Sequence, residues 1–262
     1  MKTAKYDNPT GKVNPAIAVV TTTHVPEDPI RNDGEQEENY LESVKFMLKC
    51  HKYFKAGMDY DLCIIDNDSK NKEWLEMLDE MEEVDILKRE NEGFSFGGYL
   101  SAYDRRRYYD YYLFHEQDIA PAKDNWLKEI YQVWHENEIG ALGAHIEHNK
   151  GERAYLERED VINLDGSFMF ISNEILDKCG LPIKNGEGRE DGVVNEIRFV
   201  QGILESGYAI GGMAEDDRTW FLGSSGLRAN IVEPIAETIL PLVTIHSRNL
   251  HPQMKEYFSQ VK

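Results

Sequence analysis

The stretch LFHEQDIAP, residues 113–121, ends an apolar run with two carboxylates and then becomes apolar again. The residues that lead into it, from Tyr111 to Phe114, are typical of a buried strand. Side chains alternate along an extended segment, so Glu116 and Asp118 are expected to point to the same side. Carboxylate oxygens suit Mg²⁺ and Mn²⁺, cations that also bind phosphates. The stretch therefore predicts a cation site at the end of a strand, with a solvated turn as the alternative.

Apolar, β-branched runs alternate with helical patterns on both sides of this stretch. Strands are expected at 16–23, 60–66 and 84–89, within 108–118, and at 138–146 and 162–172. Helices are expected at 35–54, about 70–83, 93–107, 125–137 and 173–180. Crossovers of this length favour parallel pairing. The pattern predicts an α/β fold with a doubly wound, mostly parallel sheet and helices on both faces.

The bulk composition fits one globular domain with a sizeable core. The chain has 262 residues, of which 41% are hydrophobic and 29% charged. We expect a single domain over 1–262, with a polar tail at 1–14 and a C-terminal extension, 213–262, packed on the core. A net charge of -19 disfavours nucleic acid and anionic membranes as partners.

The cysteines and the first residues bear on the compartment. Cys50, Cys63 and Cys179 are odd in number and lack CxxC spacing, which favours reduced thiols over a disulfide framework or a zinc site. The N-terminal residues are polar, and no apolar stretch approaches the roughly 20 residues of a membrane helix. These features predict a cytoplasmic protein without a transmembrane segment. They do not indicate an oligomeric state.

Polar side chains end three of the expected strands. They are Thr21–Thr23, Asp66–Asp68 and Glu116–Asp118. Doubly wound sheets bind their ligands beyond the carboxyl ends of the strands. We therefore expect these three groups to form one site.

Five motifs, in this order, resemble those of the GT-A nucleotide-sugar glycosyltransferases, most closely the inverting family 2 group. They are AVVTTTH (18–24), IIDNDS (64–69), RENEGFSFGG (89–98), HEQDIAP (115–121) and REDG (189–192). The resemblance covers roughly residues 16 to 212. It implies a GT-A fold and transfer of a sugar from a nucleoside-diphosphate donor to a hydroxyl of a glycan acceptor.

The chain departs from the family pattern at several positions. Glu116 stands where the first aspartate of the acidic motif is usual, and Thr22 stands where proline is common. The pair Glu190–Asp191 lies further from the Gly-Tyr of ESGYAI than in many relatives, and Asn195–Glu196 fits that distance better. The identity of the catalytic base therefore stays open.

The resemblance also implies a nucleotide-sugar site. Its residues are Thr21, Thr22, Thr23, His24, Asp66, Asn67, Asn91, Gly93, Phe94, Gly97, Gly98 and Gln117. Asp66 is expected to bind the nucleobase; its alternative role is to cap the following helix. The glycines are expected to let a helix N-terminus approach the phosphates, and close helix packing is the alternative.

The same resemblance implies a metal and a base. Asp118, Glu116 and His246 are the candidate ligands of Mn²⁺ or Mg²⁺, which would neutralise the departing diphosphate. Asp191 is the first candidate for the base that takes the acceptor proton, with Glu190 and Glu196 in reserve. The alternative for the acidic pair is a favourable interaction with the positive end of its helix.

The donor is indicated only by small features of two motifs. Gln117 within the acidic motif and the DNDS turn resemble the rhamnosyltransferase branch, which favours a dTDP- or UDP-linked donor such as rhamnose. A retaining transferase stays open as well. The competing functions are a sugar nucleotidyltransferase and a non-catalytic binding or scaffold protein derived from the fold. The residues TTTHVPEDP lack the glycine-rich, basic signature that the nucleotidyltransferase would need.

Overall fold

The computed structural model describes most of the chain. The described residues are 15–32, 37–137, 139–144, 146–150, 160–164, 168–181, 189–213, 241–244 and 259–261. Of the predicted site residues, His246 lies outside them.

A seven-stranded sheet forms the centre of the molecule, with the order β12-β8-β11-β6-β1-β4-β5. Its strands are β1 Ile17–Thr23, β4 Asp61–Asn67, β5 Asp85–Arg89, β6 Tyr111–Glu116, β8 Ala141–Gly143, β11 Phe168–Ser172 and β12 Ile210–Gly212. Only β11 pairs antiparallel within this sheet, with β6 and β8. The predicted mostly parallel α/β fold is confirmed.

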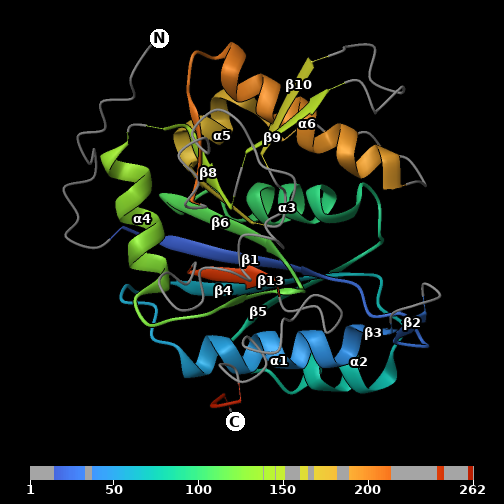
Figure 1. Cartoon of the computed structure of the whole chain (residues 1–262). Helices are drawn as coiled ribbons and strands as arrows, with labels where there is room; N and C mark the ends of the chain where they lie inside the picture. Colours follow the sequence, from blue (N-terminus) through green and yellow to red (C-terminus); the bar gives the residue numbers. More distant parts are fainter. Residues whose placement is uncertain are drawn as a thin grey trace.

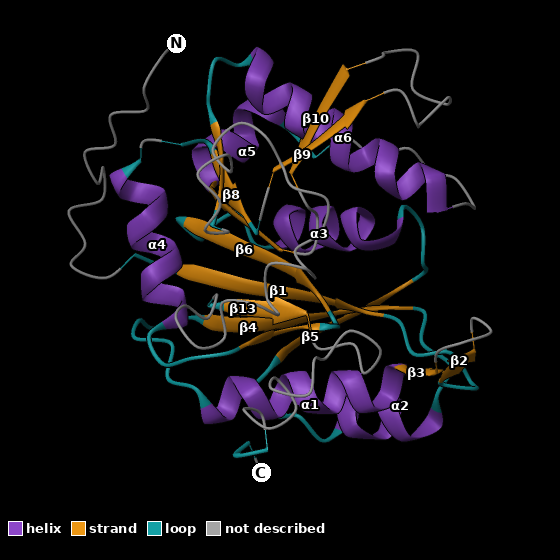
Figure 2. Ribbon diagram, viewed as in Figure 1, coloured by secondary structure: helices purple, strands orange, loops and turns teal. Residues whose placement is uncertain are grey.

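Helices cover both faces of the sheet (Figure 1, Figure 2). They are α1 Tyr40–Tyr53, α2 Lys72–Asp79, α3 Phe94–Arg105, α4 Trp126–Glu136, α5 Asn173–Cys179 and α6 Arg189–Glu205. In Figure 1, α1 and α2 lie below the sheet, and α3, α5 and α6 lie above it. The start of α4 meets α1, because the ring centroid of Trp126 lies 5.4 Å from that of His51.

Local sequence explains where several of these elements begin. Every residue of β1 is buried, as its apolar, β-branched sequence predicts for a central strand. Asn39, Asn71 and Ser172 cap α1, α2 and α5, each accepting a hydrogen bond from a backbone N–H of the first turn. Gly180 ends α5 at a φ of 67°, which confirms the predicted glycine stop.

Smaller sheets account for the main errors of the sequence prediction. The predicted strand at 162–172 is two strands, since β10 (Asp160–Leu164) pairs with β9 (Ile146–Lys150) and β11 belongs to the central sheet. The predicted loop after β1 contains β2 (Ile30–Asn32), which pairs with β3 (Glu37–Asn39). Apolar pattern alone did not reveal these pairings, because a strand's partner is set by tertiary contacts.

One strand of the predicted C-terminal extension pairs with the core. β13 (Leu242–Thr244) lies antiparallel to β7 (Ile119–Pro121), the strand that directly follows Asp118. Leu242 is fully buried there. The division into one domain and an extension stays a prediction.

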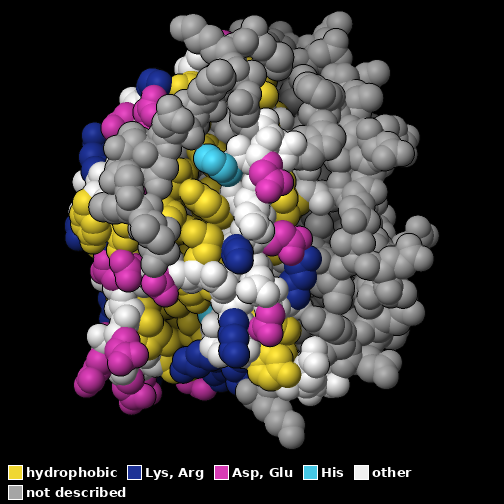
Figure 3. Space-filling model, turned by 90° about the vertical axis from the view of Figure 1, so that its left-hand side faces the viewer, with side chains coloured by type: hydrophobic (Ala, Val, Ile, Leu, Met, Phe, Trp, Pro, Cys, Tyr) yellow, Lys and Arg dark blue, Asp and Glu magenta, His cyan; other side chains and the backbone are white. Residues whose placement is uncertain are grey.

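The surface seen in Figure 3 mixes acidic and basic side chains around a band of hydrophobic ones. Within the residues that the structure describes, no helix is both long and apolar enough to cross a membrane.

Candidate functional site

The ends of β1, β4 and β6 come together in register. Thr23 pairs with Asp66, and Thr22 pairs with Glu116. Residues in register on neighbouring strands point to the same side of a sheet. Thr22 and Glu116 therefore face α3, whereas Thr23 and Asp66 face α2.

Gly98 lets α3 approach these strand ends closely, and Gly97 lets the helix pack against the loop before it. A Cβ atom at Gly98 would lie 2.5 Å from the Thr22 Cγ2 atom. A Cβ atom at Gly97 would lie 1.9 Å from the Glu92 carbonyl oxygen. Neither distance is sterically acceptable, so both positions require glycine. The helix packing that the sequence offered as an alternative is therefore observed, and phosphate binding stays a prediction.

The Asp66 carboxylate fixes the turn after β4. Its Oδ1 accepts hydrogen bonds from Trp74 Nε1 at 3.1 Å and Thr23 Oγ1 at 3.2 Å, and its Oδ2 accepts one from the Ser69 N–H at 3.2 Å. The residue is only 2% exposed. The alternative role of capping the next helix was wrong, because Asn71 is the cap of α2. A nucleobase contact stays a prediction, and it would compete with three existing hydrogen bonds.

His24 and Gln117 tie the end of β1 to the acidic motif. The His24 N–H donates to Gln117 Oε1 at 2.7 Å, and Gln117 Nε2 donates to the His24 carbonyl at 3.3 Å. The His24 ring nitrogen Nδ1 lies 2.7 Å from the Asn67 carbonyl oxygen, which adds the end of β4. The Gln117 side chain thus ties the motif that carries Glu116 and Asp118 to the backbone of His24.

The loop that enters α3 is held in an uncommon backbone conformation. Gly93 has a φ of 70° and Phe94 a φ of 52°, a region that bulky residues rarely adopt. Asn67 Nδ2 donates to the Phe94 carbonyl at 3.2 Å. Such conformations persist where surrounding contacts over-determine them.

Arg89 reinforces this loop and was missed as a site residue. Its Nη1 donates to Asn67 Oδ1 at 2.6 Å, and its Nη2 donates to the Glu92 carbonyl at 2.7 Å. Burial is the main cause that lowers the pKa of its guanidinium. Its place at a strand end, just before the glycine motif, was the signal available in the sequence. Asn91, in the same loop, is half-buried.

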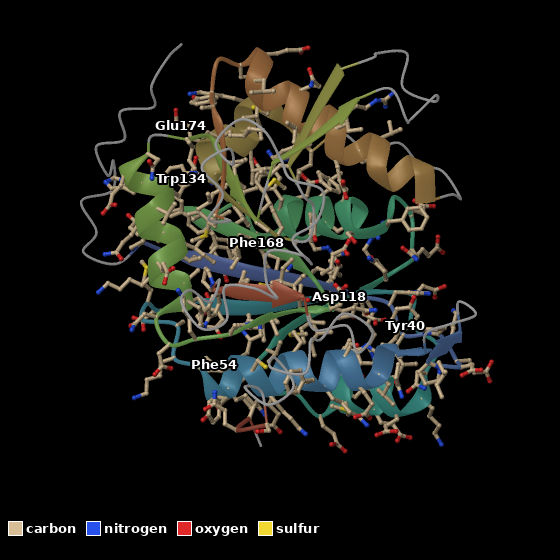
Figure 4. The ribbon with its side chains drawn as sticks, viewed as in Figure 1. Tyr40, Phe54, Asp118, Trp134, Phe168 and Glu174 are labelled. Atoms are coloured by element: carbon tan, nitrogen blue, oxygen red, sulfur yellow. The ribbon has the colours of Figure 1, made fainter. Side chains whose placement is uncertain are left out.

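Three carboxylates act electrostatically on Tyr99 of α3. Burial raises the pKa of the Tyr99 hydroxyl well above its usual value, and the negative charges of Glu116, Glu196 and Asp118 raise it further. Ser95 Oγ donates to Glu116 Oε1 at 2.6 Å. Figure 4 shows Asp118 at the strand ends, between the layer of α1 and that of α3. Glu196 on α6 therefore shares an electrostatic environment with the acidic motif.

The packing of α6 on α3 explains this position of Glu196. The rings of Phe96 and Phe199 lie 5.9 Å apart, and Asn195 is fully buried. Glu190 and Asp191 lie in the first turn of the same helix, as the sequence predicted.

The residues that the structure describes contain no group of three or more His, Cys, Asp and Glu side chains arranged to hold a metal ion. His115, within the acidic motif, faces α1 instead, where its ring stacks on that of His51 at 5.5 Å. Burial lowers the pKa of His115 to about 4, so it is neutral near pH 7. The structure thus offers two neighbouring carboxylates, Glu116 and Asp118, as the described candidates for a cation.

Comparison with known proteins supports the fold and not a family. No protein-family model matches the chain, and no curated protein matches it in sequence. A mannosyltransferase from Pyrobaculum calidifontis, in complex with GDP-Man and Mn²⁺, is similar over 77% of this chain and 55% of its own, with 12% identity and a TM-score of 0.50. This likeness shows a shared fold. The chain thus spans little more than half the length of that structure.

Two further solved structures are similar at lower scores. TarS 1–349 of S. aureus, in complex with UDP-GlcNAc, has a TM-score of 0.48 and 12% identity over 77% of this chain and 56% of its own. A CMP:2-keto-3-deoxy-manno-octonic acid synthetase, complexed with CTP, has a TM-score of 0.46 and 8% identity over 76% of this chain and 89% of its own.

Proposed function

We propose that this chain is a glycosyltransferase that moves a sugar from a nucleoside-diphosphate donor to a hydroxyl of a glycan. The observation that carries the proposal is the meeting of the β1, β4 and β6 ends with the start of α3 and with Glu196 of α6. Ligands of doubly wound sheets bind at such an edge. The fold shared with a mannosyltransferase supports it.

The donor would bind across the strand ends. The nucleoside would lie against Thr21–Thr23 and His24, and the diphosphate would face the first turn of α3, where the helix dipole favours anions. Arg89 and Asn67 support this arrangement because they fix the loop that starts the helix. A dTDP- or UDP-linked donor, such as rhamnose, stays the proposal for the sugar.

A divalent cation fits the carboxylates at the end of β6. Mg²⁺ commonly binds through one or two carboxylates together with substrate phosphates, so a trio of protein ligands is not required. We assign Asp118 to it first; Glu116 and His246 are the other candidates. When bound, Mn²⁺ or Mg²⁺ would neutralise charge on the departing diphosphate.

Glu196 is a candidate base on the described part of α6. Its charge raises the pKa of Tyr99 together with those of Glu116 and Asp118, which supports a place on the same side of the sheet as the acidic motif. The base must take the proton from the acceptor hydroxyl as that oxygen attacks the anomeric carbon. Asp191 and Glu190, in the first turn of α6, stay candidates for the same step.

Nucleotide titration tests this proposal directly. UDP, GDP, dTDP and CTP are titrated calorimetrically into the protein with Mn²⁺ and with EDTA, and then into Asp118→Asn. We expect one diphosphate to bind in a metal-dependent way, and the variant to bind it at least tenfold more weakly. The matched control is Glu174→Gln on α5, far from Asp118 in Figure 4, which should bind as the parent does. Preference for CTP would favour a nucleotidyltransferase, and no binding at all would favour a scaffold.

A further inference from the structure

Glu116 is engaged by the helix that starts beside it. Ser95 is the second residue of α3, and its hydroxyl donates to the Glu116 carboxylate at 2.6 Å. This length is typical of an O–H···O⁻ hydrogen bond, which is about twice as strong as a neutral one. One carboxylate oxygen of Glu116 is therefore oriented toward α3.

This contact is one of three that strands make with the entrance of α3. Asn67, at the end of β4, holds the Phe94 carbonyl, and Arg89, at the end of β5, holds the Glu92 carbonyl. Glu116, at the end of β6, holds Ser95. Each strand end contributes one polar side chain to a loop whose backbone at Phe94 is unfavourable by itself.

We propose that Glu116 is a positioning residue that fixes the first turn of α3, and that Asp118 alone supplies the motif's carboxylate for the cation. The inference deepens the proposed function. The cation role of Asp118 rests on that function, whereas the contact between Glu116 and Ser95 does not. An aspartate at 116 is one methylene shorter and would fall short of Ser95 Oγ. The glutamate in this chain is therefore suited to reach the helix, with its carboxylate as the acceptor.

Two substitutions at position 116 separate positioning from metal ligation. Glu116→Gln keeps the length and an acceptor oxygen but loses the charge. Glu116→Asp keeps the charge but loses the reach. A positioning role predicts that Gln substitutes better than Asp; a ligand role predicts the opposite order.

The first experiment is hydrogen exchange of the backbone amides that close the first α3 turn, beginning with the Gly97 N–H, which donates to the Gly93 carbonyl at 2.9 Å, in EDTA and without nucleotide. We expect Glu116→Asp and Ser95→Ala to speed exchange there by about tenfold, because each substitution removes one charge-assisted hydrogen bond. The double variant should exchange no faster than either single variant, and Glu116→Gln should stay within about threefold of the parent. Unchanged exchange in both Glu116→Asp and Ser95→Ala would overturn the inference, whatever the protein binds.

The second experiment measures Mn²⁺ affinity and nucleoside-diphosphate affinity for the same variants. We expect Glu116→Asp and Ser95→Ala to weaken diphosphate binding several-fold and by similar factors, with Glu116→Gln less affected. Parent-like Mn²⁺ affinity in Glu116→Asp with a tenfold loss in Glu116→Gln would identify Glu116 as a ligand and overturn the inference. If the parent protein binds no nucleotide, the proposed function fails, and hydrogen exchange still decides the role of Glu116.

Discussion

The ends of β4 and β6 both carry carboxylates, but their surroundings are opposite. Asp66 is enclosed by three donors, from Thr23, Ser69 and Trp74, that come from both sides of its turn. Glu116 and Asp118 instead share the neighbourhood of Tyr99 with a third carboxylate, Glu196. A carboxylate surrounded by donors stabilises the fold, whereas Asp118, in the acidic motif, is the carboxylate that we assign to a bound cation.

The largest expected effect is on catalysis and comes from the group of carboxylates near the end of β6. Replacing Glu196 by Gln should lower kcat by about 10²–10⁴-fold, the usual contribution of a general base, with little change in KM for the donor. Steady-state kinetics with the donor identified by titration measures this effect. Asp191→Asn is the comparison: if it loses the activity and Glu196→Gln keeps it, the base lies in the first turn of α6.

The next effect is on stability and lies on the β4 side. Asp66→Ala leaves three donors without their acceptor and should lower the free energy of unfolding by about 3 kcal/mol. Urea unfolding measures it. The control is Asp68→Asn, two residues on, where the side chain is exposed and asparagine tolerates the φ of 59°; its change should stay within about 0.5 kcal/mol. Equal losses in both variants would show that the donors around Asp66 contribute little.

A similar effect should appear with pH at His115, whose ring stacks on His51 of α1 and also feels the charge of Asp118. Burial lowers its pKa to about 4 from the usual 6.5 of histidine, so the folded protein binds fewer protons than the unfolded chain between these values. The free energy of unfolding therefore keeps its full value above about pH 6.5. It falls by up to about 3 kcal/mol as the pH is lowered toward 4. The free energy of unfolding is measured from pH 7 to 4 in EDTA for the parent protein and for His115→Asn. The variant should show a flatter dependence of this free energy on pH. The exposed His135 on α4 provides the matched substitution control, His135→Asn.

The smallest of these effects concerns the close contact between α3 and the loop that precedes it. Gly97→Ala would force a Cβ atom to within 1.9 Å of the Glu92 carbonyl oxygen and should cost about 1–3 kcal/mol. Gly202→Ala, in α6, would meet its nearest atom at 3.7 Å and should stabilise that helix by about 0.5–1 kcal/mol. Thermal unfolding of both variants gives the comparison; a stabilising Gly97→Ala would mean that α3 can move away from the loop at Glu92 without loss.

The sequence predicted the elements of this fold better than their contacts. Periodicity identifies α1, because amphipathic patterns are local, but the predicted start at residue 35 was wrong, since Glu37–Asn39 form β3. The glycine stop of α5 was predicted for the same local reason. The split of 162–172 was missed, although Asp165–Gly166 is a turn signal within it. Strand ends indicated where the site lies. They could not show that Asp66 is enclosed by donors or that Ser95 reaches Glu116, because those partners come from elements distant in the chain.

The pairing of β7 with β13 has a consequence for the order of assembly. Ile119, directly after Asp118, is in register with Thr244, and these positions are far apart along the chain. Contacts of such long range form late, because the loop between them must close first. We therefore expect the pairing of β7 with β13, directly after Asp118, to be among the last contacts to form as the chain emerges from synthesis. Until then the sheet core can form while the neighbouring edge stays open, so the folded core precedes the finished site.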